Sequence, residues 1–366
     1  MQLRPSHGWL WTAIGVSAAL ILGAPFIGQL RSAIRTAAGP SFVALLSAVV
    51  GIAAVAAIGF ALRQIQDRRS QRYRALAAAV AIAIGYSWFA ATGNAEVDAV
   101  ERFHFIEYGL ITVLFYRAWR PVGDGSVLVM PVIAGLIVGT LEEWLQWFIP
   151  VRVGEVRDVL LNLFAIATGQ LFSLGLHPPP VVTRALNPRS RRFAARVAAA
   201  GLVLLAGFVH SVHLGHEIQD ADAGVFRSRY TSEELAAIGN ARAALWKSSP
   251  PLTWSRLSRE DQYFTEGVAH VQRRNETWSN GNVMAARHEN LILEKYYAPV
   301  LDTPSYLSAT GLRWPSSQRA DAEARVGPGF MIYDSDALHY PVVTWSKWSF
   351  WSVVTALVLL VLRAGR

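Results

Sequence analysis

The sequence predicts an all-α polytopic membrane protein with about eight transmembrane helices and one mostly helical extracytoplasmic domain. Apolar residues make up 52% of the 366 residues and charged residues only 16%, whereas soluble domains carry about 25% charged residues. Several apolar stretches reach the length of about 20 residues that a helix needs to cross a bilayer. The chain has no cysteine, which excludes disulfides and thiolate chemistry.

Eight apolar stretches are the candidate membrane spans. They cover residues 9–30, 41–62, 75–92, 104–119, 127–148, 158–176, 194–212 and 344–363. The chain then divides into two helices and a basic loop (1–74), a four-helix core (75–176), a basic loop with the seventh helix (177–212), a hydrophilic α-rich domain (213–343) and a last helix (344–366). We expect the first helix to be retained, because no small-residue cleavage site follows it.

Arginines in alternate loops predict the orientation of the chain in the membrane. They follow the second, fourth, sixth and eighth spans: Arg63, Arg68, Arg69, Arg72, Arg74, Arg117, Arg120, Arg184, Arg189, Arg191, Arg192, Arg363 and Arg366. The positive-inside rule then places both termini in the cytoplasm and residues 213–343 outside. Arg31 and Arg35 are exceptions on the opposite side.

The charge is also unevenly distributed. Residues 213–343 carry 13 Lys/Arg and 16 Asp/Glu, a net charge of −3. Because the overall net charge is +8, the rest of the chain carries +11. An excess of basic residues beside membrane spans indicates contact with anionic lipid headgroups, and not with nucleic acid.

The hydrophilic domain shows three helix patterns. Thr231 and Glu234 form a capping box before a helix that ends near Trp246. A second helix starts at Ser258 and runs to about residue 274, and a third covers about 283–297. We expect residues 301–318 to form a loop and residues 329–343 to be extended, because the latter are rich in aromatic and β-branched residues.

Polar residues interrupt three spans near one membrane face, and they are the main candidates for a functional site. They are His104, Glu107 and Tyr108 in the fourth span, Glu143 and Gln146 in the fifth, Asp158 and Asn162 in the sixth, and Arg152 in the loop between the last two. Helical spacing places the members of each span on one face, and alternating span direction places all of them in the outer part of the bilayer. Charges at bilayer depth are costly and usually functional. The alternative is a polar network that only locks three helices together.

Two further patterns carry structural or metal-binding expectations. Gly135 and Gly139 form a small-xxx-small face for close helix packing. His210, His213 and Glu217 would share a face if the seventh helix continued past residue 213, and two histidines with a carboxylate suit a divalent metal such as Zn²⁺. The alternative for these three residues is a polar cap at the membrane interface. No other cofactor is predicted.

The hydrophilic domain lacks a recognisable catalytic motif. Its polar residues His270, His288, Glu289, Asn290, Asp334, Asp336 and His339 are scattered along the chain. The sequence contains no Ser-His-Asp order, nucleophile elbow, P-loop or dinucleotide fingerprint. Whether the chain is an enzyme is left open.

Residues 75–175 resemble the VanZ-like family of bacterial membrane proteins. The resemblance rests on His104-Phe with Tyr108, Glu143-x-x-Gln146, Arg152, Asp158-x-x-x-Asn162 and Gly169. Ala165 replaces a glycine usual in the family, and the pair Glu101-Arg102 lies one residue closer to the histidine than is common. The resemblance implies a bacterial inner-membrane protein of the cell envelope, in a family with members associated with teicoplanin resistance.

These observations lead to one main hypothesis and two alternatives. The main hypothesis is a VanZ-like protein that binds a lipid or lipid-linked headgroup at the outer leaflet. If the protein is an enzyme, it also modifies that headgroup. Arg152 would contact a phosphate, Gln146 and Asn162 would orient the headgroup, and His104 or Glu143 would move a proton if a reaction occurs. The alternatives are a non-catalytic accessory or scaffold subunit with a protein partner in the envelope, and a proton-coupled transporter.

Overall fold

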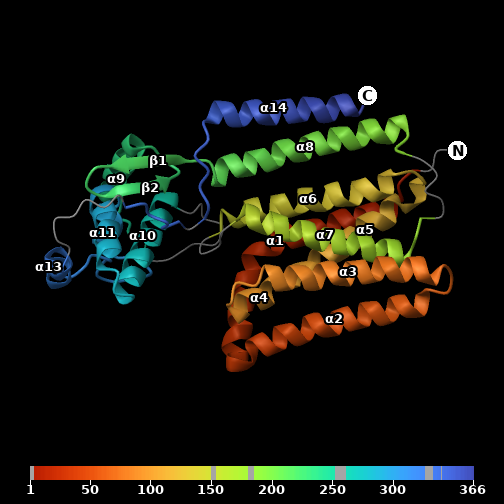
Figure 1. Ribbon diagram of the computed structural model, residues 1–366, viewed down its shortest axis with the longest axis horizontal. Coiled ribbons are helices and arrows are strands. Elements are labelled where there is room, and N and C mark those ends of the chain that lie inside the picture. The colour runs from red at the N-terminus through yellow and green to blue at the C-terminus, as the bar shows by residue number, and fades with distance from the viewer. Residues whose placement is uncertain (1–3, 150–153, 180–184, 252–260, 326–332, 339) are drawn as a thin grey trace. The chain divides into compact units, whose positions relative to one another are not determined.

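The computed structural model describes residues 4–149, 154–179, 185–251, 261–325, 333–338 and 340–366. The chain is mostly helical, at 75%, as the sequence predicts. It forms two compact units, one of Met1–Gln146, Gly154–Gly207 and Trp351–Arg366, the other of Trp147–Val153 and Phe208–Phe350 (Figure 1).

The first unit is a bundle of long helices. It contains α1 (His7–Ala38), a 3₁₀ turn (Gly39–Ser41), α2 (Phe42–Gln64), α3 (Arg69–Phe89), α4 (Ala95–Glu101), α5 (Phe103–Trp119), a second 3₁₀ turn (Arg120–Val122), α6 (Ser126–Gln146), α7 (Val156–Leu176) and most of α8 (Pro188–Val212) and α14 (Lys347–Ala364).

Five helical stretches are long and apolar enough to cross a membrane, which indicates a multi-pass membrane protein. They are His7–Gln64, Ser126–Gln146, Val156–Leu176, Pro188–Val212 and Lys347–Ala364. The first contains both α1 and α2, so these five stretches cover six of the eight predicted spans. The predicted spans 75–92 and 104–119 are also helical, as α3 and α5, but α5 has only 17 residues and α3 begins with an arginine-rich turn.

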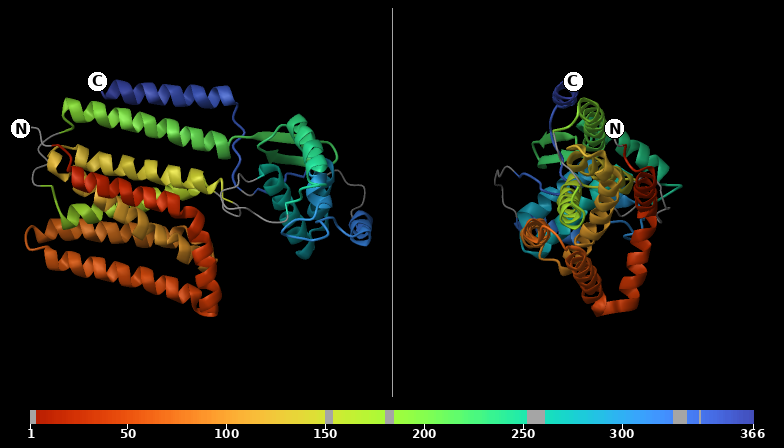
Figure 2. Two further views of the ribbon diagram at one scale, coloured as in Figure 1. Left: turned by 180° about the vertical axis from the view of Figure 1, so that it is seen from behind. Right: turned by 90° about the vertical axis from the view of Figure 1, so that its right-hand side faces the viewer.

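Helix α7 lies at the centre of the bundle and packs against α3, α5 and α6 (Figures 1 and 2). The expected close packing at Gly135 and Gly139 is confirmed. A Cβ on Gly135 would stand 2.9 Å from Ile166, and one on Gly139 would stand 3.1 Å from the Asn162 amide nitrogen. Small residues on α6 therefore let α7 approach closely.

Arg31 and Arg35, the two exceptions to the arginine pattern, have an acidic partner. Both guanidinium groups pair with Glu96 on α4, at 3.0 Å and 3.1 Å. Their charges are thus compensated within the bundle.

The second unit is a small domain of helices and one hairpin. It contains β1 (His216–Asp220), β2 (Gly224–Ser228), α9 (Ser232–Leu245), α10 (Gln262–Ser279), α11 (Val283–Tyr296), α12 (Ala298–Asp302) and α13 (Ser316–Arg325). The strands pair antiparallel, with His216 opposite Ser228 and Asp220 opposite Gly224. The core is formed by buried side chains such as Phe226, Phe264 and Ile292.

The predicted helices of this domain are confirmed, but the hairpin and two helices were missed. Thr231 caps α9 with the expected capping box, and α10 and α11 lie where two further helices were predicted. Ser258, the predicted start of α10, lies outside the described residues, and the described N-cap is Asp261. The stretch 301–318, expected to be a loop, is overlapped by helices only at its two ends, by α12 up to Asp302 and by α13 from Ser316.

Candidate functional site

The candidate site is a buried polar cluster where α6 ends and α5 and α7 begin. Helices α5 and α7 run parallel, and α6 runs antiparallel to both, so the first turns of α5 and α7 meet the last turns of α6 (Figure 1). Tyr108 on α5 is fully buried, and its hydroxyl donates a hydrogen bond of 2.9 Å to Glu142 Oε2 on α6.

Glu142 and Glu143 are joined by one amide. Gln146 Nε2 donates to Glu142 Oε1 at 2.6 Å and to Glu143 Oε1 at 3.2 Å. The backbone N–H of Glu155, the N-cap of α7, donates to Glu143 Oε2 at 3.4 Å. Both carboxyl groups and the amide are at most 5% exposed. The last turn of α6 is thereby linked to α5 through Tyr108 and to the start of α7 through Glu155.

Asn162 adds an unsatisfied amide to this cluster from α7. The residue is fully buried, and an added Cβ on Gly139 would lie 3.1 Å from its nitrogen and 3.3 Å from the Tyr108 ring. Neither polar atom of its side chain has a hydrogen-bond partner among the described residues. Such groups are rare, because an unsatisfied buried amide costs about 1–3 kcal/mol.

The other predicted members lie around the edge of the cluster. His104, Glu107 and Asp158 are each partly exposed, and the His104 ring lies edge-on to Tyr108 at 6.1 Å. Asp158 occupies the first turn of α7, where a negative charge is favourable. The prediction for Arg152 falls outside the described residues.

The candidate set from the sequence left out Glu142, which accepts from both Tyr108 and Gln146. The signal was present, because Glu142 and Gln146 are four residues apart and share a helix face. It also missed Arg157, which pairs with Glu101 at 2.8 Å. Glu101 therefore contacts the start of α7, although its distance from the histidine departs from the family pattern.

The chemistry of the described cluster is that of a hydrogen-bond acceptor. Four carboxyl groups, those of Glu107, Glu142, Glu143 and Asp158, lie on the three helices within a few turns of one another. Burial raises the pKa of a fifth, Glu155, at the loop end of α7. Such a set suits hydroxyl or ammonium groups as ligands.

The predicted metal site does not form as expected. Helix α8 ends at Val212, and Glu217 lies in strand β1, so His210, His213 and Glu217 do not share a helix face. Glu217 pairs with Arg227 at 3.4 Å, and a ring nitrogen of His213 lies 2.8 Å from the carbonyl of Pro341. Within the described ranges, no group of three or more His, Cys, Asp or Glu residues could hold a metal ion.

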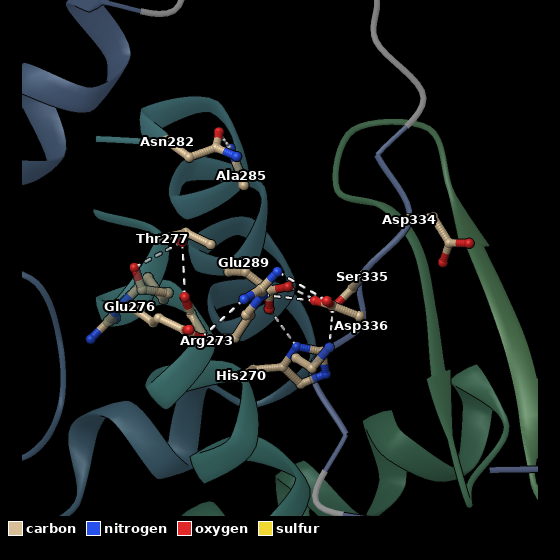
Figure 3. Close-up of polar contacts among 12 residues, drawn as sticks. His270, Arg273, Glu276, Thr277, Asn282, Ala285, Glu289, Asp334, Ser335 and Asp336 are labelled. Carbon is tan, nitrogen blue, oxygen red and sulfur yellow. Dashed lines mark hydrogen bonds and ion pairs between the residues drawn. The ribbon is translucent and has the colours of Figure 1, made fainter. Parts of the chain in front are cut away.

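The domain of α9–α13 contains a second buried polar network, centred on Glu289 (Figure 3). His270 Nδ1 lies 2.6 Å from Glu289 Oε2, and the hydroxyls of Ser335 and Tyr333 each donate to Oε1 at 2.5 Å. Glu289 stands between the serine and the histidine, whereas a nucleophilic triad needs the histidine in the middle. The carboxylate is fully buried, so the network is a structural element of the core.

The remaining polar residues singled out in this domain also have protein partners. His288 stacks on Tyr333, Asn290 accepts from Arg274, Asp334 pairs with Arg227, and Asp336 pairs with Arg273. His339 lies outside the described residues.

The fold and the polar cluster define a multi-pass helical membrane protein with a buried polar site at one end of its bundle. Comparison of the chain with protein families, curated proteins and solved structures finds no match.

Proposed function

We propose that this protein is a VanZ-like envelope protein of the bacterial inner membrane that binds a lipid or lipid-linked headgroup through the cluster of Tyr108, Glu142, Glu143, Gln146 and Asn162. In this proposal α3 and α5 cross the membrane together with the six long helices of the five candidate stretches, which gives eight spans. The arginine-rich loops lie in the cytoplasm, so the cluster faces the outer leaflet.

One observation carries the proposal, and it is the unsatisfied amide of Asn162. Glu142 and Glu143 accept hydrogen bonds from neighbouring elements, from Tyr108 on α5 and from Glu155 at the start of α7. Asn162 is equally buried, but both its polar atoms lack a hydrogen-bond partner among the described residues. A purely structural network gains nothing from an amide in that state. A headgroup that exchanges hydrogen bonds with Asn162 would offset the cost of burying it.

The headgroup class follows from the acceptors around Asn162. Carboxylates select hydroxyl and ammonium donors, which sugars and amine-bearing lipids supply. Arg152 would add a contact to the phosphate that joins such a headgroup to its lipid.

The test is to measure the lipid that co-purifies with Asn162→Ala protein. We expect at least a tenfold loss of one co-purifying lipid species relative to the unaltered protein, as measured by mass spectrometry after gentle extraction. Thr168→Val is the matched control, because its hydroxyl is also buried without a described partner on α7, about 9 Å further along the helix.

A structural role for Asn162 predicts a different result. Removal of an unsatisfied amide would then leave the lipid content unchanged and would keep or raise the thermal midpoint. That pair of outcomes would refute the headgroup site.

A second candidate function is an accessory or scaffold subunit that docks a protein partner through the domain of residues 213–343. It is favoured by the closed polar network around Glu289, which suits a rigid, non-catalytic domain. Isolation of the protein from native membranes as a lone monomer would remove most of its support. A proton-coupled transporter is the third candidate, and a flat liposome proton-flux assay would argue against it.

A further inference from the structure

A pocket lies at the other end of the helix bundle from the polar cluster. It is formed where α2, α5 and α7 end and α3 begins, and it has a volume of about 350 Å³ and opens to solvent. Its charged lining consists of Arg68, Arg72, Arg120 and Asp67, with His177 beside them. Figure 1 shows the α2–α3 turn and the last turn of α7 at the same end of the bundle.

Arg72 is committed to the structure of this pocket. Its guanidinium donates to the carbonyls of Gly175 at 2.7 Å and Leu176 at 2.6 Å, and it also pairs with Asp67. It therefore compensates the only acidic side chain of the lining and also the negative end of α7, which would otherwise repel an anion.

Arg68 and Arg120 are positive charges for which the described residues provide no acidic partner. Arg120 has one long hydrogen bond of 3.4 Å to the carbonyl of Pro178. Arg68 is exposed, and its side chain has no hydrogen bond or ion pair within the described part of the chain. Neither arginine pairs with a carboxylate in that part of the chain, so the pocket has a positive excess.

The backbone of Arg68 is also unusual. Its φ of 43° makes it the one non-glycine residue with positive φ in the described ranges, a conformation that costs a non-glycine residue about 1 kcal/mol or more. Such strain persists where the surrounding structure or a ligand maintains it. Here it places an arginine directly before the first turn of α3.

His177 adds no positive charge to the pocket. Burial, together with the nearby charges of Arg117, Arg120 and Arg72, lowers the pKa of its imidazole. The ring is therefore neutral at physiological pH, and its Nε2 lies 3.1 Å from Arg117.

We propose that this pocket binds a phosphate-bearing anion, with Arg68 and Arg120 as its two guanidinium ligands. Arginine matches phosphate geometry with paired hydrogen bonds. Basic pockets between the ends of membrane helices bind anionic headgroups. The phosphate can belong to an anionic lipid or to a soluble phosphate compound, and both sources share this chemistry. The site is separate from the polar cluster and does not depend on it.

The test uses the full-length protein in detergent, with phosphatidylglycerol, phosphatidylcholine and inorganic phosphate as probes. Native mass spectrometry measures the lipid adducts, and a thermal shift measures phosphate binding. The variant is Arg68→Gln with Arg120→Gln. The matched control is Arg63→Gln with Arg74→Gln, because both of these arginines are exposed and lie outside the pocket.

We expect the unaltered protein to prefer phosphatidylglycerol over phosphatidylcholine. The Arg68/Arg120 variant should bind phosphatidylglycerol at least tenfold less than the unaltered protein, whereas the control should bind it equally. A phosphate-induced thermal shift that only this variant loses, without a lipid preference, assigns the pocket to a soluble anion. Substitution of both arginines by lysine, which keeps the charge, should retain part of the binding. Equal binding in the variant and the control would overturn the proposal. So would the absence of binding of both phosphatidylglycerol and inorganic phosphate to the unaltered protein.

Discussion

At the scale of single residues, Glu142 links α5 and α6 within the polar cluster. Its two carboxyl oxygens accept from Tyr108 on α5 and from Gln146 one helical turn further along α6. A charged or polar group at this depth is tolerated only when such partners compensate its desolvation. Asn162 differs because its amide has no such partner among the described residues, and this contrast is the reason we propose it as a ligand-binding residue.

Glu289 gives a pH-dependent prediction at the same scale. Burial alone would raise the pKa of its carboxyl, but His270 and the hydrogen bonds from Ser335 and Tyr333 outweigh burial and lower the pKa. A lowered pKa stabilises the fold above the unfolded value of about 4.3, and this stability is lost as the pH falls through the folded pKa.

We therefore expect Glu289→Gln to lower the free energy of unfolding by about 1–3 kcal/mol at neutral pH. The difference in thermal midpoint from the unaltered protein should be full above pH ~5 and should shrink below pH ~4. Thermal scans across pH measure it. Glu323→Gln is the control, since that side chain is 55% exposed. A difference that stays constant down to low pH would contradict the assigned role.

At the scale of elements, the contact between α5 and α7 depends on a missing side chain. A Cβ on Gly169 would lie 2.7 Å from the carbonyl oxygen of Gly109 and 2.8 Å from its Cα. Backbone atoms cannot move aside as a flexible side chain can. The close approach of the two helices, which positions Tyr108 and Asn162 together, therefore requires glycine at 169.

Gly169→Ala should destabilise the protein by about 1–3 kcal/mol, because α5 and α7 must separate. Gly109→Ala is an unusually close control. It lies in the same contact, but its own Cβ would meet nothing within 4 Å, so alanine should be neutral or should stabilise α5 by up to about 1 kcal/mol. Denaturation in detergent compares the two variants. Equal losses would show that the contact does not govern stability.

The sequence predicted the elements whose signals are local. The helix of residues 232–245 was found from its capping box, which the structure contains. The hairpin was missed because its signal is tertiary. Gly215 has space for only a hydrogen, since a Cβ there would stand 2.4 Å from the carbonyl of Ser228. A histidine-rich pattern suggested that α8 continued, whereas the chain turns into β1 after Val212.

The candidate site was predictable in part for the same reason. Helical spacing selected the correct faces of α6 and α7, and the structure brings Glu143, Gln146 and Asn162 into one buried region with Tyr108. Spacing could not show that Glu142 accepts from Tyr108, because that contact depends on how α5 and α6 pack. It also could not show that Asn162 lacks a partner, because that is a property of the packed helices.

At the scale of the whole molecule, the bundle has two chemically different ends. One end carries carboxyl groups of the polar cluster, and the other carries the arginines around Arg68 and Arg120. A bilayer with anionic lipid on its inner face favours the arginine end in the cytoplasm. We therefore expect residues 213–343 to lie outside the cell membrane.

The absence of native cysteine makes this orientation directly testable. Single cysteines introduced as Ser279→Cys and Ser70→Cys occupy exposed positions, one in the domain of residues 213–343 and one at the start of α3. In intact spheroplasts a membrane-impermeant maleimide should label the first and not the second. After lysis it should label both. Labelling of Ser70→Cys alone before lysis would invert the topology and move the polar cluster to the inner leaflet.

The most direct test of the headgroup site is a cryo-EM map of the protein in nanodiscs formed from its own membrane. We expect density that continues from a lipid tail to within hydrogen-bond distance, about 3 Å, of the Asn162 amide, beside Glu142 and Glu143. A map in which a protein side chain satisfies Asn162 and no lipid density enters the cluster would refute the headgroup site.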